Sequence, residues 1–422
     1  MNDLSRRRFL NRMANACLGV GALGLTPSLS AIGAEPGVRR RPTAKNVIML
    51  YMAGGMSHLD TFDPKPGTAE QGALQAIPTS VDGMSFGQHL PLLAAQAHRL
   101  TLLRSMTSTQ GAHEQGEYFM RTGFVQRGGI RHPSLGAWIS HSSPRINPTL
   151  PASVVLGGGG QHPGAGFFTA AHAPLPLGDP AAGLPAARPA PGIDDERFRR
   201  RLALADALDA GYRAGNDQPT VRAYGDLYRE ACALMDSPDL AAFDLTKEPE
   251  ALRDRYGEDR FGQGCLLARR LVENDVRCVE VVMGGWDTHD DHAERIADQC
   301  AILDQGASAL IADLAGRGLL DETLVILATE FGRTPTFNER DGRDHYPKAF
   351  SCWLAGGGVR GGHVHGATDA RGATATSAPV QVQDLHATAA HALGLARDEV
   401  LSPAGRPFRM ADKGTALTSV FA

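Results

Sequence analysis

The chain has 422 residues, with 42 lysines and arginines against 46 aspartates and glutamates, and 15 histidines. Its 42% hydrophobic and 21% charged residues are typical of a globular protein with a large core. The formal net charge of -4 excludes broad electrostatic attraction to nucleic acid, so we expect no nucleic-acid partner.

The N-terminal residues have the pattern of an export signal. Paired arginines within Ser5–Leu10 precede a weakly apolar stretch, Met13–Leu25, and small residues follow at 31–34. This pattern predicts a twin-arginine signal peptide over 1–34, followed by a linker over 35–45. We therefore expect the twin-arginine export machinery as a partner and a periplasmic or secreted mature protein. No later apolar run reaches the roughly 18–20 residues that span a bilayer, so no stable membrane span is expected in the mature chain.

Buried strands alternate with helices along the rest of the chain. The apolar run Asn46–Met52 is too short for a typical helix and predicts a strand buried on both faces. Comparable runs are Leu100–Leu103, Ala152–Leu156, Arg277–Met283, Thr323–Thr329 and Ala349–Leu354. Apolar residues at helical spacing occur in Arg197–Tyr212, Val221–Met235, Arg260–Asn274 and Ala293–Ala315. The alternation predicts one α/β domain over 46–422 with a mostly parallel central sheet, and a helical insertion over about 194–274, where strand signals are missing.

Acidic residues and histidines gather at the ends of the predicted strands. In open parallel sheets, ligands bind beyond the carboxyl ends of the strands, so these side chains are expected to meet at one edge. The candidate metal ligands are His58, Asp60, His113, Asp287, His289, Glu330, Asp344 and His345. Carboxylates with imidazoles suit zinc, calcium, magnesium or manganese and need no thiolate. The sequence therefore predicts a divalent-metal site.

The strongest candidates lie in two segments. Asp287 and His289 belong to a run of acids and histidines, although they could instead begin and cap the helix that follows. Asp344 and His345 lie in a Gly-rich loop, which rarely needs both residues for folding.

The other candidates have structural alternatives of similar weight. His58 and Asp60 could order a Gly-rich turn through side-chain hydrogen bonds. Glu330 and Arg333 could form an ion pair without function. His113 follows a Ser/Thr-rich stretch that could simply be a capped loop.

An ordered set of motifs spans the mature chain. It comprises Gly54–Pro66 (GGMSHLDTFDPKP), Trp286–His289 (WDTH), Thr329–Pro335 (TEFGRTP), Gly342–Pro347 (GRDHYP) and Ala355–Gly362 (AGGGVRGG). Together with the twin-arginine signal, these motifs resemble the exported bacterial family called domain of unknown function 1501. That family is grouped with the alkaline phosphatase and sulfatase superfamily. The resemblance implies a three-layer α/β sandwich with a metal site at the strand ends.

The function that this combination favours is metal-dependent hydrolysis of phosphate or sulfate esters, with a small anionic ester as substrate. The ion would polarise the ester oxygen, and Arg333 or Arg343 would hold the anion. The nucleophile would be Ser57, Ser105, Thr107 or an activated water molecule.

Two alternatives remain open on the sequence. The first is a non-catalytic periplasmic binding or assembly protein that keeps the fold but has lost the standard metal site. The second is carbohydrate recognition by Trp286 and Tyr346, because aromatic faces beside polar groups suit sugars.

Overall fold

The computed structural model describes residues 42–158, 161–184, 187, 194–216 and 219–422. The predicted signal peptide and most of the predicted linker lie outside these residues. Among the helices described, none combines the length and the apolar character needed to cross a bilayer.

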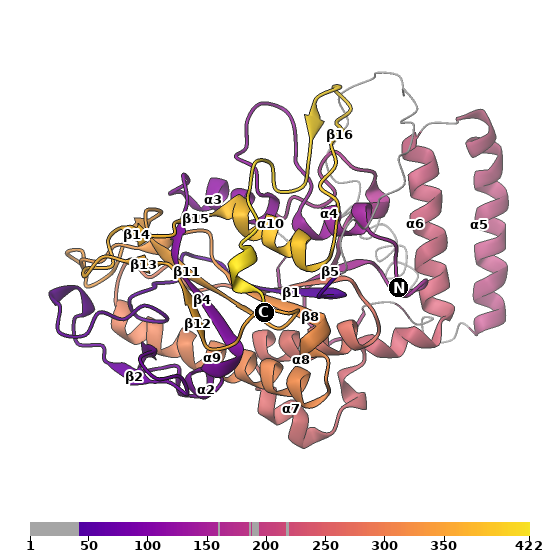
Figure 1. The fold of residues 1–422 in the computed structure, drawn as a ribbon. Coiled ribbons are helices and arrows are strands. Elements are labelled where there is room, and N and C mark those ends of the chain that lie inside the picture. The colour runs from indigo at the N-terminus through magenta and orange to yellow at the C-terminus, as the bar shows by residue number, and fades with distance from the viewer. Residues whose placement is uncertain (1–41, 159–160, 185–186, 188–193, 217–218) are drawn as a thin grey trace.

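A nine-stranded sheet forms the centre of the described structure (Figure 1). Its order is β12 (His363–His365), β4 (Leu100–Thr107), β11 (Phe350–Ala355), β8 (Thr323–Ala328), β1 (Asn46–Met52), β7 (Cys278–Met283), β5 (Ser153–Leu156) and β6 (Leu175–Leu177), with β15 (Val380–Gln381) also paired to β4. Strand β1 pairs in parallel with β7 and β8, whereas β11 runs antiparallel to β4 and β8. The predicted, mostly parallel α/β sheet is confirmed.

The two faces of the sheet pack into two separate cores. Along β1, Ile48 and Leu50 belong to one hydrophobic cluster, and Val47 and Met49 belong to the other. Successive side chains of a strand point to opposite faces, so a continuous apolar run fills both cores. The first core contains α2 (Pro91–Ala95), α8 (Arg260–Glu273) and α9 (His292–Gly316), and the second contains α3 (His113–Thr122), α4 (Leu135–Ser142) and α10 (Val382–Ala392). The result is a three-layer sandwich.

Every element described in the segment predicted as a helical insertion is a helix. The segment contains α5 (Asp195–Gly215), α6 (Pro219–Asp236), α7 (Glu250–Tyr256), α8 and two 3-10 helices, Pro238–Phe243 and Leu245–Lys247. Helix α8 packs on β7 and α9, as a covering helix of the sheet does. Helix α5 lies at the edge of the molecule in Figure 1, and its Leu204 and Leu208 are exposed.

The register of the parallel strands brings their carboxyl ends to one edge. Met52 of β1 lies opposite Met283 of β7, and Tyr51 lies opposite Ala328 of β8. The loops that follow these strands therefore leave the sheet together. Short antiparallel pairs outside the central sheet are β2–β3 (Ala76–Pro78, Ser85–Gly87), β9–β10 (Gly332–Arg333, His345–Tyr346), β13–β14 (Ala367–Thr368, Ala375–Ser377) and β16–β17 (Val400–Leu401, Pro407–Phe408).

Candidate metal centre

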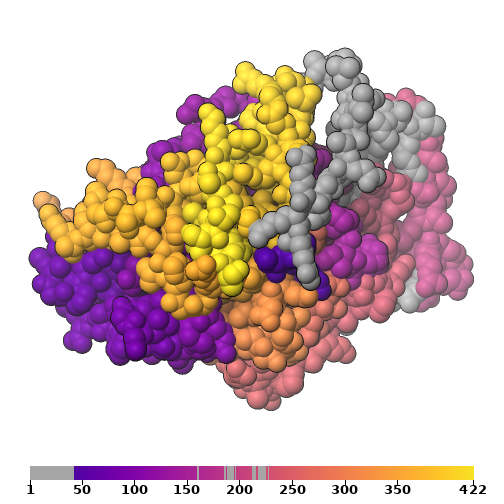
Figure 2. Space-filling model, viewed as in Figure 1, coloured from indigo at the N-terminus to yellow at the C-terminus, as the bar shows by residue number. Residues whose placement is uncertain are grey.

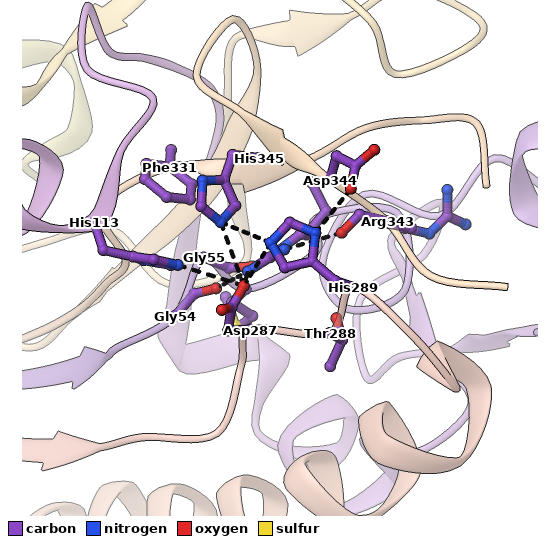
Figure 3. A network of polar contacts seen from close by, with 12 residues as sticks. Gly54, Gly55, His113, Asp287, Thr288, His289, Phe331, Arg343, Asp344 and His345 are labelled. Atoms are coloured by element: carbon purple, nitrogen blue, oxygen red, sulfur yellow. Dashed lines mark hydrogen bonds and ion pairs between the residues drawn. The ribbon is translucent and has the colours of Figure 1, made fainter. Parts of the chain in front are cut away.

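Three histidines meet at the carboxylate of Asp287 (Figure 3). The Asp287 Oδ1 atom lies 3.3 Å from His113 Nε2, 3.0 Å from His289 Nε2 and 3.3 Å from His345 Nε2. His289 Nε2 and His345 Nε2 are themselves only 3.0 Å apart. Asp287 and His289 follow β7, His345 belongs to β10, and His113 begins α3. Segments far apart in the sequence thus contribute to one cluster at the carboxyl edge of the sheet.

The other ring nitrogen of each histidine is held by an oxygen acceptor. The pairs are His113 Nδ1 with Glu330 Oε1 (2.8 Å), His289 Nδ1 with Asp344 Oδ1 (2.7 Å), and His345 Nδ1 with the Gly111 carbonyl (2.9 Å). Carbonyl and carboxylate oxygens only accept, so each Nδ1 must donate its proton. A neutral ring then keeps a lone pair on Nε2, the atom that points into the cluster. Metal-binding histidines have this arrangement, with an outer acceptor fixing the tautomer.

The cluster fits a bound cation on two further observations. The Nε2 atom of His113 is buried and has no hydrogen-bond partner within the described part of the chain. His113, Asp287 and His345 also offer ligand atoms that all lie within 4.8 Å of one another. Ligands 2.0–2.1 Å from a tetrahedral ion are about 3.3 Å apart, which is close to the 3.0–3.3 Å contacts around Asp287.

Arg333 holds Asp287 in place. Its Nη2 atom lies 2.5 Å from Asp287 Oδ1, while Nε donates to the Gly55 carbonyl and Nη1 to the Arg343 carbonyl. The guanidinium is fully buried. Burial acts to raise the pKa of Asp287, but the hydrogen bond and charge of Arg333 outweigh it and lower this pKa to about 2. Arg333 therefore positions a candidate ligand and has no exposed face for the substrate anion that the sequence assigned to it.

The charges of the cluster favour a cation. Burial lowers the pKa of His345, which keeps this ring neutral near pH 7. The hydrogen bond to Glu330 raises the pKa of His113, and the hydrogen bond from His289 lowers that of Asp344. The histidines contact three carboxyl groups, those of Asp287, Glu330 and Asp344, and the one guanidinium bonded to these carboxyl groups is that of Arg333, so the surroundings of the rings are negative in balance.

Glu330 lies behind His113, away from the point where the histidines meet. Its Oε1 atom accepts from Gly54 N at 2.8 Å, and Oε2 accepts from the Tyr51 hydroxyl at 3.1 Å. A second possible ligand group, His113 with Glu117 and Glu330, is also close enough for a cation. Because protein donors already occupy both Glu330 oxygens, Glu330 is better suited to orient His113 than to bind an ion.

Two glycines allow the loop after β1 to approach the cluster. Gly54 has φ +121°, and a Cβ there would lie 2.6 Å from the backbone nitrogen of Asp287. A Cβ at Gly55 would lie 2.7 Å from the Phe331 ring. That ring packs with its centroid 4.6 Å from the centroid of His345. Glycine is therefore required at both positions for the loop to pack this closely.

Three of the predicted site residues, Ser57, Asp60 and Arg343, form a separate buried network with His292, centred on Asp60. Asp60 Oδ2 lies 2.5 Å from Ser57 Oγ, 2.8 Å from His292 Nε2 and 2.9 Å from Arg343 Nε. His58 lies in the same loop. The side chains of Asp60, Ser57, His58 and Arg343 are buried, so none of these side chains offers a polar group to the Asp287 cluster or to a substrate.

The remaining predicted residues also bond elsewhere. His58 Nε2 lies 2.8 Å from the Gly372 carbonyl. Ser105 Oγ donates to the Ala378 carbonyl at 2.6 Å, and Thr107 Oγ1 donates to the Val380 carbonyl at 3.2 Å. Neither hydroxyl contacts the cluster, because both belong to β4 and bond to the neighbouring 378–380 segment.

Three contributors to the cluster were not predicted. Gly111 acts through its carbonyl, which has no signature in the sequence. Phe331 packs on the histidines, although the sequence offers only its position after Glu330. Tyr51 carries the one usable signal, since strand alternation places its side chain in the core that contains α3.

The solved structures that resemble this chain include a sulfatase, a phosphonate monoester hydrolase and an alkaline phosphatase. The sulfatase PsFucS1 from Pseudoalteromonas sp. has 14% identity and a TM-score of 0.38, covering 84% of this chain and 68% of that one. The phosphonate monoester hydrolase from Silicibacter pomeroyi has 11% identity and a TM-score of 0.37, and the match covers 88% of this chain and 76% of that one. The alkaline phosphatase from the Antarctic bacterium TAB5 has 12% identity and a TM-score of 0.33, and the match covers 75% of this chain and 92% of that one. At such low identities and TM-scores, these likenesses carry no conclusion about the activity of this chain.

The sequence itself matches a family across nearly all of the described structure. No curated protein matches it significantly. The model of the family described as "Protein of unknown function (DUF1501)" matches residues 44–421, which include every strand of the central sheet and every residue of the Asp287 cluster. This chain therefore belongs to the DUF1501 family.

Proposed function

We propose that this chain is an exported, metal-dependent hydrolase of phosphate or sulfate esters. The observation that carries the proposal is the convergence of three imidazole Nε2 atoms on Asp287 Oδ1, each ring fixed by an acceptor at Nδ1. Imidazole nitrogens with one carboxylate oxygen favour zinc over calcium, magnesium and manganese, which take mostly oxygen ligands. The proposed ligands are His113, Asp287 and His345, with His289 beside them.

The chain's own residues would prepare the site for a small anionic ester. A divalent ion bound there supplies Lewis-acid polarisation of an ester oxygen. Arg333 keeps Asp287 ionised and oriented, and Asp344 and Glu330 fix the rings of His289 and His113. The side chains of the cluster are partly open to solvent, from 23% exposed for His345 to 46% for Asp287. A substrate can therefore reach them.

Water is the proposed nucleophile. The hydroxyls of Ser57, Ser105 and Thr107 donate to other groups, two of them to backbone carbonyls. Both arginines proposed to bind the anion are buried. Because none of the three hydroxyls faces the cluster, direct attack by a water molecule is favoured over a covalent intermediate on a side chain.

The test is metal content and ester hydrolysis of protein purified after export. We expect about one zinc ion per chain and hydrolysis of an aryl phosphate or an aryl sulfate. His345→Ala should remove most of the metal and the activity while the protein stays folded. His363→Ala, a histidine of β12 outside the cluster, is the control. Wild-type protein that takes up no divalent ion, or His345→Ala with unchanged metal content, would contradict the proposal.

Export is tested separately. Arg6→Lys with Arg7→Lys should leave the precursor inside the cell if the twin-arginine machinery recognises this segment. Unchanged periplasmic or secreted protein would contradict this part of the proposal.

A second candidate is a binding or assembly protein without catalysis. It is favoured because no predicted nucleophile reaches the cluster and because both arginines predicted to bind the anion are buried. Metal binding without hydrolysis of either ester would select this candidate.

A further inference from the structure

A large cavity lies beside the loop that leads to His113. Its volume is about 670 Å³, within the range of about 300–1,000 Å³ that is usual for small-molecule sites. Thr107–Gln110 forms part of its wall, and the next residue, Gly111, accepts the hydrogen bond from His345 Nδ1. Phe119 of α3 also lines it, about 9 Å along the helix from His113 at 1.5 Å per residue. The cavity and the Asp287 cluster therefore share one loop and one helix.

Cationic side chains predominate around this cavity. Arg127, Arg406 and Lys413 line it and are exposed, against a single acid, Asp412. The whole chain carries a net charge of -4, so this local excess of positive charge runs against the overall balance. Guanidinium and ammonium groups bind carboxylate, sulfate or phosphate through charge-assisted hydrogen bonds. The ligand of this cavity should therefore carry carboxylate, sulfate or phosphate groups.

The remaining polar lining matches a ligand rich in hydroxyl groups. Ser108, Thr109, Gln110, Gln381 and Gln383 all have side chains that both donate and accept hydrogen bonds. A simple inorganic anion offers mainly acceptors and fills little of the volume, whereas sugar hydroxyls use both kinds of partner. The Oε1 atom of Gln383 is buried and has no hydrogen-bond partner within the described residues, which leaves an acceptor for a hydroxyl donor.

Apolar side chains complete the lining. Phe408, Ile130 and Val125 are partly exposed there, and Phe124 stacks on His132 with ring centroids 4.4 Å apart. Such surfaces suit the C–H faces of pyranose rings. In the space-filling view, the C-terminal segment that supplies Phe408 lies at the surface (yellow in Figure 2).

We propose that this cavity binds an acidic oligosaccharide, and that it holds the part of the substrate remote from the ester at the Asp287 cluster. Its role as a subsite rests on the proposed hydrolase function, whereas binding itself needs no ion. The cavity also differs from the sugar site expected from the sequence. Trp286 is buried, and the Tyr346 hydroxyl donates to the Ala373 carbonyl.

The test is titration calorimetry with trigalacturonate, whose carboxylates cannot be hydrolysed as esters, on full-length mature protein treated with a chelator. Maltotriose, a neutral trisaccharide, and a nucleoside diphosphate are the comparison ligands. We expect saturable binding of trigalacturonate that weakens with salt, and much weaker binding of both comparison ligands. Arg406→Gln with Lys413→Gln should weaken binding at least about tenfold, since two charge-assisted contacts are lost.

The matched control is Arg199→Gln with Arg200→Gln on α5, which removes the same charge at the edge of the molecule (Figure 1). It should leave binding unchanged. Equal loss in both double variants, no binding of trigalacturonate, or tighter binding of the nucleotide would each overturn the proposal. Because the protein is metal-free, these outcomes are independent of whether the Asp287 cluster binds an ion.

Discussion

His289 and His345 face each other through their Nε2 atoms at 3.0 Å. The Nδ1 atom of His289 donates to Asp344 and that of His345 donates to the Gly111 carbonyl, so neutral rings would direct two lone pairs at one another. A cation between or beside them removes this repulsion, and Asp287 Oδ1 provides the negative charge to hold it. Among the described residues, the relationship between these two rings is the strongest sign of an ion site.

Asp344 should control metal affinity without being a ligand. Asp344→Asn weakens the acceptor that fixes His289 Nδ1, and loss of such outer contacts lowers metal affinity by about 10–100-fold. Competition with a fluorescent zinc chelator measures the change. Glu339→Gln, at an exposed position in the same loop, should leave affinity unchanged. Equal affinities of Asp344→Asn and the wild type would show that His289 needs no such partner.

Gly54 should tolerate no side chain. Gly54→Ala would place Cβ 2.6 Å from Asp287 N at a φ of +121°, so we expect a loss of about 2–4 kcal/mol in unfolding free energy from overpacking and backbone strain together. Gly83→Ala is the control, because φ is +76° there but no atom lies within 4 Å of the added Cβ. It should cost only about 1 kcal/mol. Urea unfolding of chelator-treated protein gives both values, and similar losses would show that the close approach to Asp287 is unimportant.

Glu280 should make stability depend on acid pH. Burial acts to raise the pKa of Glu280, but the charges of Arg121 and His162 outweigh it and lower this pKa from 4.5 to about 2. A lowered carboxyl pKa stabilises the folded state above pH 4.5, and this contribution of about 3 kcal/mol is lost as the pH falls toward 2.

The variant Glu280→Gln leaves Arg121 without its nearest buried acid and should lose about 3–5 kcal/mol at pH 7. Its stability should then fall less than that of the wild type between pH 4.5 and 2. Glu322→Gln breaks an exposed pair with Lys45 and should cost at most about 1 kcal/mol. Parallel pH curves for Glu280→Gln and wild type would contradict the lowered pKa.

Asp60 should hold together the loops that carry the proposed ligands. Its partners His292 and Arg343 are close in sequence to the proposed ligands Asp287 and His345. Asp60→Ala leaves the buried guanidinium of Arg343 uncompensated and should cost about 3–5 kcal/mol. Asp290→Ala breaks an exposed pair with Arg295 and should cost at most about 1 kcal/mol. Thermal unfolding compares the two variants, and equal costs would mean that the Asp60 network is not structural.

The sequence alone determined the fold class and the edge of the sheet where the site lies. The apolar run Asn46–Met52 was predicted with the bounds that the strand has, because a strand buried on both faces leaves a continuous hydrophobic signal. Strands that run parallel end at one edge, so the segments with Asp60, Asp287 and Glu330 could be grouped without knowledge of their contacts. His345 was predicted in the loop before the next strand, and that loop reaches the same edge because β11 runs antiparallel to β8.

Only the tertiary structure decided which of these polar side chains meet. Asp60 and Asp287 both follow a buried strand and look alike in the sequence, yet one closes a buried network with Arg343 and the other faces three histidines. Glu330 accepts the hydrogen bond from His113 Nδ1, and the Gly111 carbonyl accepts the one from His345 Nδ1. The role of a backbone carbonyl cannot be predicted from the type of its residue. The physical reason is that residue type and strand position set where a loop begins, whereas backbone turns and packing set where each side chain points.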